Sequence, residues 1–199
     1  MNPFRLSFIL LFVLFIVVRG YYHRKSGTVG EPIESEAENK AIPFLRRRAG
    51  VPWIIGVFVY MVYPPWMAWA ELPLPDWLDW LRWLGVGFAA ATIALLLWIH
   101  HALDKNFSTR PQIRADHTLI TSGPYRWVRH PMYPTLMLFS LAAFLLSANW
   151  FIGAPPILIV ALIMITRPPK EEQQLIEKFG NEYREYMKHT GRFLPRLSR

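Results

Sequence analysis

The stretch PTLMLFSLAAFLLSANWFIGAPPILIVALIMIT, residues 134–166, decides the fold class. It holds two apolar segments, 134–148 and 151–166, which are separated only by Asn149 and Trp150. A helix that crosses a bilayer needs about 20 mostly apolar residues, and a connection this short joins antiparallel helices. The stretch therefore predicts two membrane spans in a tight hairpin, with an irregular start to the second span at Gly153 and Pro155-Pro156.

Three more apolar segments precede this hairpin, at residues 4–18, 51–70 and 80–101. The pair Pro64-Pro65 removes backbone donors and should kink or break the second of them near its end. The chain of 199 residues is 53% hydrophobic, with 9 Trp and 13 Phe, which suits lipid better than water. We therefore expect an all-α integral membrane protein with about five transmembrane helices.

The first apolar segment resembles a secretory signal in its basic start. Arg19, Arg24 and Lys25 follow it, where a cleavage site would have small residues. We expect a retained anchor. The chain has no Cys, so a disulfide framework, a thiolate zinc site and a Cys nucleophile are excluded.

The basic residues gather in three connecting segments, 19–50, 102–133 and 167–199, which hold 20 of the 22 Lys and Arg. In a five-span chain these segments lie on one side, and Lys and Arg are retained on the cytoplasmic side. This places the N-terminus outside and the C-terminus in the cytoplasm. The net charge of +8 is then explained by orientation and contact with anionic lipid, and nucleic acid is not an expected partner.

The polar loop from His117 to Tyr133 is dense in donors, aromatic rings and turn formers directly before a span. Gly123-Pro124 predicts a turn, and Pro131 restricts His130 to extended conformations that can aim its imidazole away from a helix. Such a loop at a membrane face is typical of a binding site. The alternative is an interfacial aromatic belt, with Arg126 and Arg129 as lipid-facing anchors.

A second polar segment starts where the last span ends, at Thr166 to Glu172. Pro169 suits the first turn of a helix, and acidic residues there complement its positive end. Leu175, Phe179 and Tyr183 then recur every four residues, which predicts amphipathic helices over 168–190. The alternative for Arg167 and Glu171 is a simple ion pair at a helix start.

No dinucleotide, P-loop, zinc-protease or serine-hydrolase motif occurs in the sequence. His100 and His101 are adjacent and point to different helix faces, so a shared metal is not expected. We divide the chain into an N-terminal region, 1–103, with spans one to three and the cytoplasmic connection 19–50, and a catalytic region, 104–199. The latter comprises a cofactor loop at 104–133, the hairpin at 134–166 and the helices at 168–190.

The order of Arg129-His130-Pro131-Met132-Tyr133, a hairpin, Arg167-x-x-x-Glu171-Glu172 and Phe179-Gly180-Asn181-Glu182-Tyr183 resembles the isoprenylcysteine carboxyl methyltransferase family. The likeness runs from about Phe107 to Pro195. Phospholipid N-methyltransferases and the C-terminal part of sterol reductases are similar as well. A reductase using reduced nicotinamide, or a non-catalytic membrane scaffold, stays open as an alternative.

The resemblance implies S-adenosylmethionine as the cofactor and a lipophilic or prenylated acceptor, with no metal. It implies Arg167 as the residue that binds the acceptor and serves catalysis. The residues that it implies for the cofactor are Gln112, His117, Thr118, Leu119, Ile120, Tyr125, His130, Pro131, Met132, Tyr133 and Glu171.

The residue types suit this chemistry. A carboxylate such as Glu171 accepts from the ammonium or ribose of the cofactor, His130 donates to its carboxylate, and Tyr125 or Tyr133 faces a ring or the sulfonium. An acceptor carboxylate is already ionised near neutral pH and needs no general base. An amine acceptor would need one, and Glu172 or a water molecule are the candidates.

Overall fold

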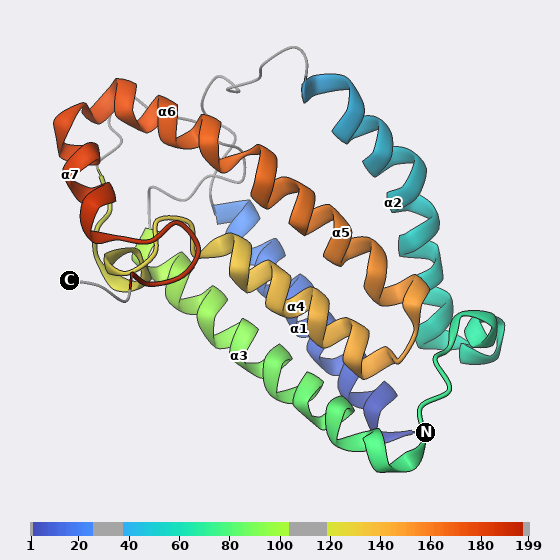
Figure 1. Cartoon of the computed structure of the whole chain (residues 1–199). Helices are drawn as coiled ribbons and strands as arrows, with labels where there is room; N and C mark the ends of the chain where they lie inside the picture. Colours follow the sequence, from blue (N-terminus) through green and yellow to red (C-terminus); the bar gives the residue numbers. More distant parts are fainter. Residues whose placement is uncertain (1, 26–37, 104–118, 197–199) are drawn as a thin grey trace. The chain divides into compact units, whose positions relative to one another are not determined.

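The computed structural model describes residues 2–25, 38–103 and 119–196, with the side chains of residues 38–49 left out. Within these ranges the chain is helical, and its only bridges between extended residues are two isolated pairs, Glu71 with Asn149 and Val128 with Gly191. The α-helices (Figure 1) are α1 (Pro3–Lys25), α2 (Glu38–Val62), α3 (Asp79–Leu103), α4 (Met132–Ser147), α5 (Trp150–Thr166), α6 (Pro168–Phe179) and α7 (Asn181–His189). Shorter 3-10 helices are η1 (Pro64–Ala70), η2 (Asp76–Leu78) and η4 (Gly123–Arg126).

Three continuous helical segments are long and apolar enough to cross a membrane: Pro3–Lys25, Asp76–Leu103 and Trp150–Phe179. Two shorter apolar helices, Gly50–Val62 and Met132–Ser147, coincide with the other two predicted spans. Large apolar side chains are exposed along these helices, for example Phe58 at 65% and Ile165 at 73%. In water this surface would be unfavourable, whereas lipid accommodates it. The expectation of an all-α integral membrane protein is confirmed, and the count of five spans stays a prediction.

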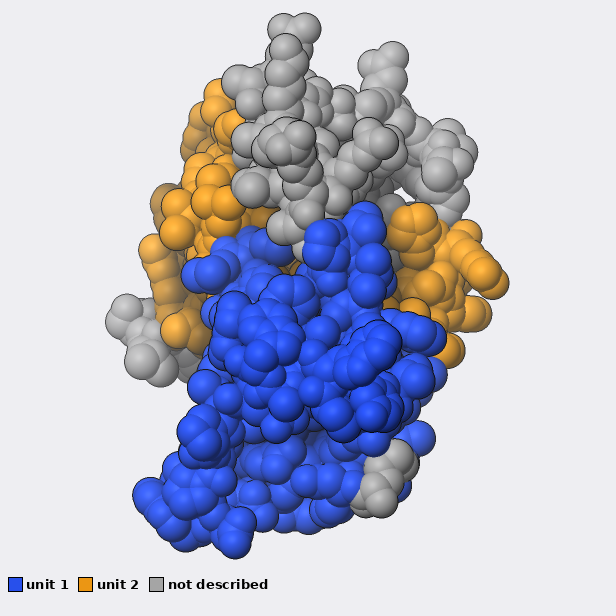
Figure 2. Space-filling model, turned by 90° about the vertical axis from the view of Figure 1, so that its right-hand side faces the viewer, with its two compact units in different colours: residues 1–15, 34–91, 138–159 blue, residues 16–33, 92–137, 160–199 orange. Residues whose placement is uncertain are grey.

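The chain forms two compact units, which Figure 2 distinguishes by colour. Unit 1 comprises residues 1–15, 34–91 and 138–159, and unit 2 comprises residues 16–33, 92–137 and 160–199. Helices α1, α3, α4 and α5 each contribute residues to both units. The division of the chain at residue 103 into spans and a catalytic region stays a prediction.

Unit 1 has an apolar core built from helices distant in the sequence. Phe8 of α1 meets the ring of Tyr60 of α2 edge to face at 5.2 Å, and Leu146 and Ile152 are buried in the same cluster. Gly153 allows α4 and α5 to approach closely, since a Cβ atom at this position would lie 2.2 Å from the ring of Phe144. A side chain there would force the hairpin apart.

The turn of this hairpin centres on Asn149, which is fully buried. Its side-chain amide donates to the Met67 carbonyl at 3.0 Å, and its side-chain oxygen accepts from the Ile152 backbone at 3.2 Å. Asn149 therefore caps the start of α5 and ties the hairpin to η1. The predicted break at Pro64-Pro65 is seen as well, because α2 ends at Val62 and η1 begins at Pro64.

Unit 2 has a more polar interior. His100, Glu172 and Thr190 are buried in it beside Leu96, Ile99 and Tyr183. Helix α6 begins directly after α5, with Arg167 in a helical conformation between them, so the chain stays helical through Pro168-Pro169. Gly180, at φ 57°, then separates α6 from α7. Because of this continuity, Glu171 lies in the first turn of α6 and Glu172 directly follows it.

Candidate functional site

A backbone pairing builds the centre of unit 2. The segment after η4 pairs with a C-terminal segment: Arg129 N–H donates to Gly191 O at 2.8 Å, His130 N–H donates to Arg192 O at 3.0 Å, and Gly191 N–H donates to Trp127 O at 3.1 Å. A Cβ atom on Gly191 would lie 1.7 Å from the Leu194 carbonyl oxygen, so this segment tolerates only glycine there. The pairing brings Arg192 to the same place as His130.

His130 lies between the two glutamates of α6. Its Nδ1 is 3.3 Å from a carboxylate oxygen of Glu171, and its Nε2 is 3.4 Å from one of Glu172. Only 8% of the side chain is exposed. Burial disfavours the charged imidazole, but the contacts with Glu171 and then Glu172 outweigh it and raise the pKa of His130.

Glu171 also accepts a hydrogen bond from the Tyr133 hydroxyl at 2.6 Å. Tyr133 and His130 belong to the first of the two predicted polar segments, and Glu171 belongs to the second. The structure therefore brings three of the predicted cofactor residues into direct contact. Their donors and acceptors differ in kind, which a ligand with both an ammonium and a carboxylate group requires.

Glu172 has a different environment. It is 4% exposed, and Arg129 donates to it from Nε at 2.9 Å. Arg192 donates to both of its oxygens, from Nε at 3.2 Å and from an Nη2 atom. Burial alone would raise the pKa of Glu172, but His130, Arg192 and Arg129 together lower it far below its ordinary value. Glu172 is therefore held as a charged carboxylate by three basic side chains.

Arg129 completes this ion-pair network. Its side chain is 8% exposed and also donates to the carbonyls of Met187, at 3.2 Å, and Thr190. The alternative that Arg129 is a lipid-facing anchor is wrong, because the guanidinium group is buried and fully engaged within unit 2. Its contacts join the loop to α6 and α7 at once.

The other predicted residues have varied environments where the structure describes them. The Tyr125 carbonyl accepts the Tyr186 hydroxyl at 2.6 Å, and burial raises the pKa of both phenols, that of Tyr186 to about 12. Pro131 accepts the Thr135 hydroxyl at 2.8 Å, and Met132 begins α4. Leu119 and Ile120 are half-buried in an extended segment. Gln112, His117 and Thr118 lie outside the described residues.

Arg167 stands immediately before α6, and its carbonyl accepts the backbone N–H groups of Lys170 and Glu171, both at 3.1 Å. Its side chain makes no hydrogen bond or ion pair with any other residue that the structure describes. The alternative of a simple Arg167–Glu171 ion pair is therefore wrong, since Glu171 contacts His130 and Tyr133 instead.

The sequence did not predict the ion pairs and hydrogen bonds that hold this site together. Arg192, Tyr186 and the paired role of Glu172 were not predicted. A signal for the first was present in Gly191-Arg192, a glycine next to a cation after the last amphipathic helix. Nothing in the local sequence pattern predicts that Gly191 and Arg192 pair with the backbone of Arg129 and His130.

The apolar helices and the buried ionisable cluster define this chain as an integral membrane protein with a candidate ligand site in unit 2. Residues 84–177, slightly less than half of the chain, match the model of the isoprenylcysteine carboxyl methyltransferase (ICMT) family. The matched range contains both His130 and Glu171.

Individual relatives are similar over the same part of the chain. The human protein-S-isoprenylcysteine O-methyltransferase is 32% identical over 127 residues, which are 64% of this chain and 44% of that protein. A methanethiol S-methyltransferase from Pseudomonas deceptionensis is 29% identical over 163 residues, 74% of this chain and 59% of that protein. The chain thus spans less than two thirds of the length of these curated relatives.

The fold has a counterpart among solved structures. The eukaryotic intramembrane Ras methyltransferase ICMT superposes with a TM-score of 0.64 at 20% identity, over 98% of this chain and 68% of that one. At this identity the likeness concerns the fold.

Proposed function

We propose that this chain is a membrane methyltransferase that transfers a methyl group from S-adenosylmethionine to a lipophilic acceptor, in the first place the carboxylate of a prenylated cysteine. The observation that carries the proposal is the contact of His130, Tyr133 and Glu171 at 2.6 to 3.3 Å, inside the range that matches the methyltransferase family. The human and Pseudomonas relatives are named as methyltransferases.

The donor set of this cluster fits the proposed cofactor. Glu171 offers a carboxylate for an ammonium group or a ribose diol, and His130 offers a donor for a carboxylate. Tyr133 holds Glu171 in place from the first turn of α4. Bound S-adenosylmethionine would supply an electrophilic methyl group on a sulfonium. The further contacts proposed for it are those of Gln112, His117, Thr118, Leu119, Ile120, Tyr125, Pro131 and Met132.

The acceptor side of the proposal rests on Arg167. Its guanidinium makes no ion pair among the described residues, whereas Arg129 and Arg192 are committed to Glu172. A planar guanidinium can hold a carboxylate through two parallel hydrogen bonds and so fix its orientation toward the methyl group. Reaction of an anion with a sulfonium removes charge, so a site that excludes water favours it.

The state of Glu172 favours a carboxylate acceptor over an amine. An amine must lose a proton during methylation, and the lowered pKa of Glu172 makes this carboxylate a weak base. Water would then be the remaining acceptor of the proton. A carboxylate acceptor is already ionised near neutral pH, so its methylation needs no group to accept a proton.

A small thiol is a second candidate acceptor. The methanethiol S-methyltransferase match extends over 74% of this chain, compared with 64% for the human relative. A thiol reacts as its thiolate, so the rate of its methylation would rise steeply with pH up to the pKa of the thiol. Methylation of a carboxylate would not show this rise.

The proposal includes a topology. Five spans, with the N-terminus outside and the candidate site facing the cytoplasm, follow from the distribution of Lys and Arg. The five apolar helices support this count. Accessibility tags at both ends of the chain test it, and finding both ends on one side of the membrane would exclude five spans.

Binding of labelled S-adenosylmethionine to the detergent-purified protein tests the cofactor, with reduced nicotinamide as the competing ligand. A panel of prenylcysteine, lipid-amine and small-thiol acceptors then tests the reaction, and base-labile volatile label identifies a carboxyl ester. Binding of neither ligand would favour the scaffold alternative and refute the proposal.

Two variants separate the roles of the residues. Glu171→Gln should weaken cofactor binding by roughly one to two decades, because a charge-assisted hydrogen bond of about 1.5 to 3 kcal/mol is lost. Arg167→Lys should leave cofactor binding intact and lower turnover, since a point charge does not reproduce the guanidinium fork. Equal and small effects of both variants on binding and turnover would refute the two assignments.

A further inference from the structure

Unit 1 contains a pocket of about 260 Å³ that shares no residue with the candidate methyl-transfer site. Its polar lining is Asn2, Arg5, Tyr60, Glu71 and Arg82, and Leu72 and Leu74 form part of its apolar wall. The lining residues come from the start of α1, the end of α2, η1 and the segment after it, the first turn of α3 and the end of α4. The pocket therefore joins segments of unit 1 that are distant in the sequence.

Two arginines supply positive charge. Arg5 donates from Nη2 to the carbonyls of Met61 and Val62, the latter at 3.0 Å. Arg82 donates from Nη2 to the Leu146 carbonyl at 3.1 Å, and its guanidinium lies 4.1 Å from the centre of the Phe4 ring. Carbonyls at the ends of α2 and α4 thus hold both guanidinium groups in place, although neither neutralises them.

Each arginine also keeps an unsatisfied donor. The Nε atoms of Arg5 and Arg82 are buried, and neither has a hydrogen-bond partner in the described part of the chain. Buried donors of charged groups without a partner are unfavourable. No carboxylate among the described residues pairs with either guanidinium group, so an anion bound beside Arg82 would meet a positive charge that is not neutralised.

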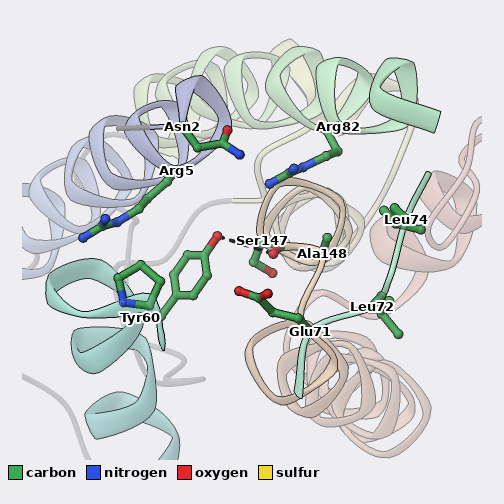
Figure 3. A pocket seen from close by; sticks show the side chains of 10 residues that line it. Asn2, Arg5, Tyr60, Glu71, Leu72, Leu74, Arg82, Ser147 and Ala148 are labelled. Carbon is green, nitrogen blue, oxygen red and sulfur yellow. Dashed lines mark hydrogen bonds between the residues drawn. The ribbon is translucent and has the colours of Figure 1, made fainter. Parts of the chain in front are cut away.

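Glu71 supplies a negative charge beside them. Its backbone is fixed by a hydrogen bond to Ala68 O at 3.1 Å and by the bridge to Asn149. Its carboxylate is exposed and makes no hydrogen bond or ion pair with the residues that the structure describes. Figure 3 shows the polar ends of Glu71, Tyr60 and Arg82 turned toward one central space, whereas the guanidinium of Arg5 points away from it, toward the end of α2.

Tyr60 adds a neutral group at this centre. Its hydroxyl donates to the Ser147 carbonyl at 3.4 Å, a long contact that leaves the oxygen able to accept. The pocket thus offers cationic donors and a separate carboxylate within one cavity. A ligand with a phosphate and an amine matches both, whereas a simple anion would leave Glu71 without a partner.

The segments that line the pocket also carry exposed tryptophans. Trp66 and Trp69 of η1 are 70% and 59% exposed, and Trp80 and Trp83 of α3 are 58% and 54% exposed. Exposed tryptophans of membrane proteins gather at the level of the lipid headgroups. The pocket's own segments therefore lie where phospholipid headgroups are available.

We propose that this pocket binds the headgroup of a phosphoethanolamine phospholipid, with Arg82 on the phosphate and Glu71 on the ammonium. The bound lipid is a structural ligand of unit 1. This inference does not depend on the methyl-transfer function.

Native mass spectrometry of the full chain, after exchange into mixed micelles with equal amounts of phosphatidylethanolamine, phosphatidylglycerol and phosphatidylcholine, tests the proposal. We expect the ethanolamine lipid to be retained over the glycerol lipid by about tenfold or more, because each tenfold preference corresponds to about 1.4 kcal/mol. Phosphatidylcholine should bind more weakly than the ethanolamine lipid, since its quaternary ammonium has no N–H to donate to Glu71.

Glu71→Gln is the informative variant, because it removes an exposed charge that supports no other contact. It should bring retention of the ethanolamine and glycerol lipids to near parity. Arg82→Gln should lower retention of all three lipids at least tenfold. Glu182→Gln, an exposed glutamate on α7 outside the pocket, is the matched control and should change nothing.

Equal retention of the three lipids by the unchanged protein would overturn the proposal. So would an unaltered lipid preference in Glu71→Gln. Full displacement of the lipid by free phosphate alone would identify a simple anion site instead and would also contradict the proposal.

Discussion

Two clusters of charged side chains in this molecule differ in how completely they are paired. In unit 2, Glu172 is 4% exposed and contacts Arg129, Arg192 and His130. In unit 1, Arg82 and Glu71 line one pocket, where Arg82 keeps a buried unsatisfied Nε and Glu71 keeps an exposed carboxylate. Both clusters have arginines and a glutamate, so composition alone does not distinguish them.

The two clusters differ in how much hydrogen-bonding and charge-pairing capacity their side chains leave unused. A buried charge with all its partners present has a structural role, and its loss leaves the partners unsatisfied. A charge with free capacity at a pocket can bind a ligand without rearrangement. Glu171 stands between these extremes, because it contacts His130 and Tyr133 but no arginine.

The largest expected effect is on stability. Glu172→Gln leaves the buried Arg129 without its counter-charge and should lower the free energy of unfolding by about 3 to 5 kcal/mol. Glu71→Gln should leave it unchanged, because its exposed side chain holds no contact. Chemical or thermal unfolding in detergent measures both. If both variants lost a similar free energy of unfolding, the two glutamates would not differ in their structural roles as their contacts predict.

The next largest effect is expected on cofactor affinity, when the hydrogen bond that holds Glu171 is removed. Tyr133→Phe removes the 2.6 Å hydrogen bond to Glu171 but keeps the ring. Cofactor affinity should fall about tenfold or more, since a hydrogen bond to a charged group contributes about 1.5 to 3 kcal/mol. Equilibrium titration with S-adenosylmethionine measures this, and Tyr63→Phe, an exposed tyrosine of unit 1, is the control. An unchanged affinity would place Tyr133 among the purely structural residues.

A smaller effect is expected on the pH dependence of stability. The folded protein raises the pKa of His130 above its ordinary value of 6.5, so protonation stabilises the fold. This contribution is fully present below pH 6.5 and is lost as the pH rises through the raised pKa. In His130→Gln, stability should no longer fall over this pH range. Melting temperatures recorded from pH 6 to pH 9 for both proteins measure the difference. Parallel profiles for both proteins would contradict the assignment.

The smallest effect is expected at an exposed ion pair. Glu185 and Lys188 of α7 contact each other at 2.6 Å, with 62% and 65% of their side chains exposed. Water screens such a pair, so Glu185→Gln should leave the melting temperature unchanged. A marked loss there would mean that exposure does not predict the cost of removing a charge in this protein.

The helical architecture follows directly from the sequence because long apolar segments have few alternatives in lipid. The break at Pro64-Pro65 and the end of α6 at Gly180 are local effects of single residue types. The burial of Asn149 at the hairpin turn is different, since it depends on the Met67 carbonyl from another segment. Periodicity carries no information on such a partner.

The same distinction holds within the candidate site. His130, Tyr133 and Glu171 were found through a resemblance that covers the segments where they lie. Arg192 was not, because its place depends on a backbone pairing between residues 127–130 and 191–192. The sequence left a lipid anchor open as the alternative for Arg129, because an arginine beside a span is commonly exposed and only the folded chain shows that this one is buried.

That backbone pairing has a consequence for the synthesis of the protein. His130 acquires its neighbour Arg192 only after the chain has been extended by the intervening residues. At roughly 5 to 20 residues per second, this delay is about 3 to 12 s. Arg129 gains Glu172 as a possible partner only after 43 further residues and the Thr190 carbonyl only after 61, so its charge must stay solvated until then. The cluster is thus completed last, after the apolar helices are already made.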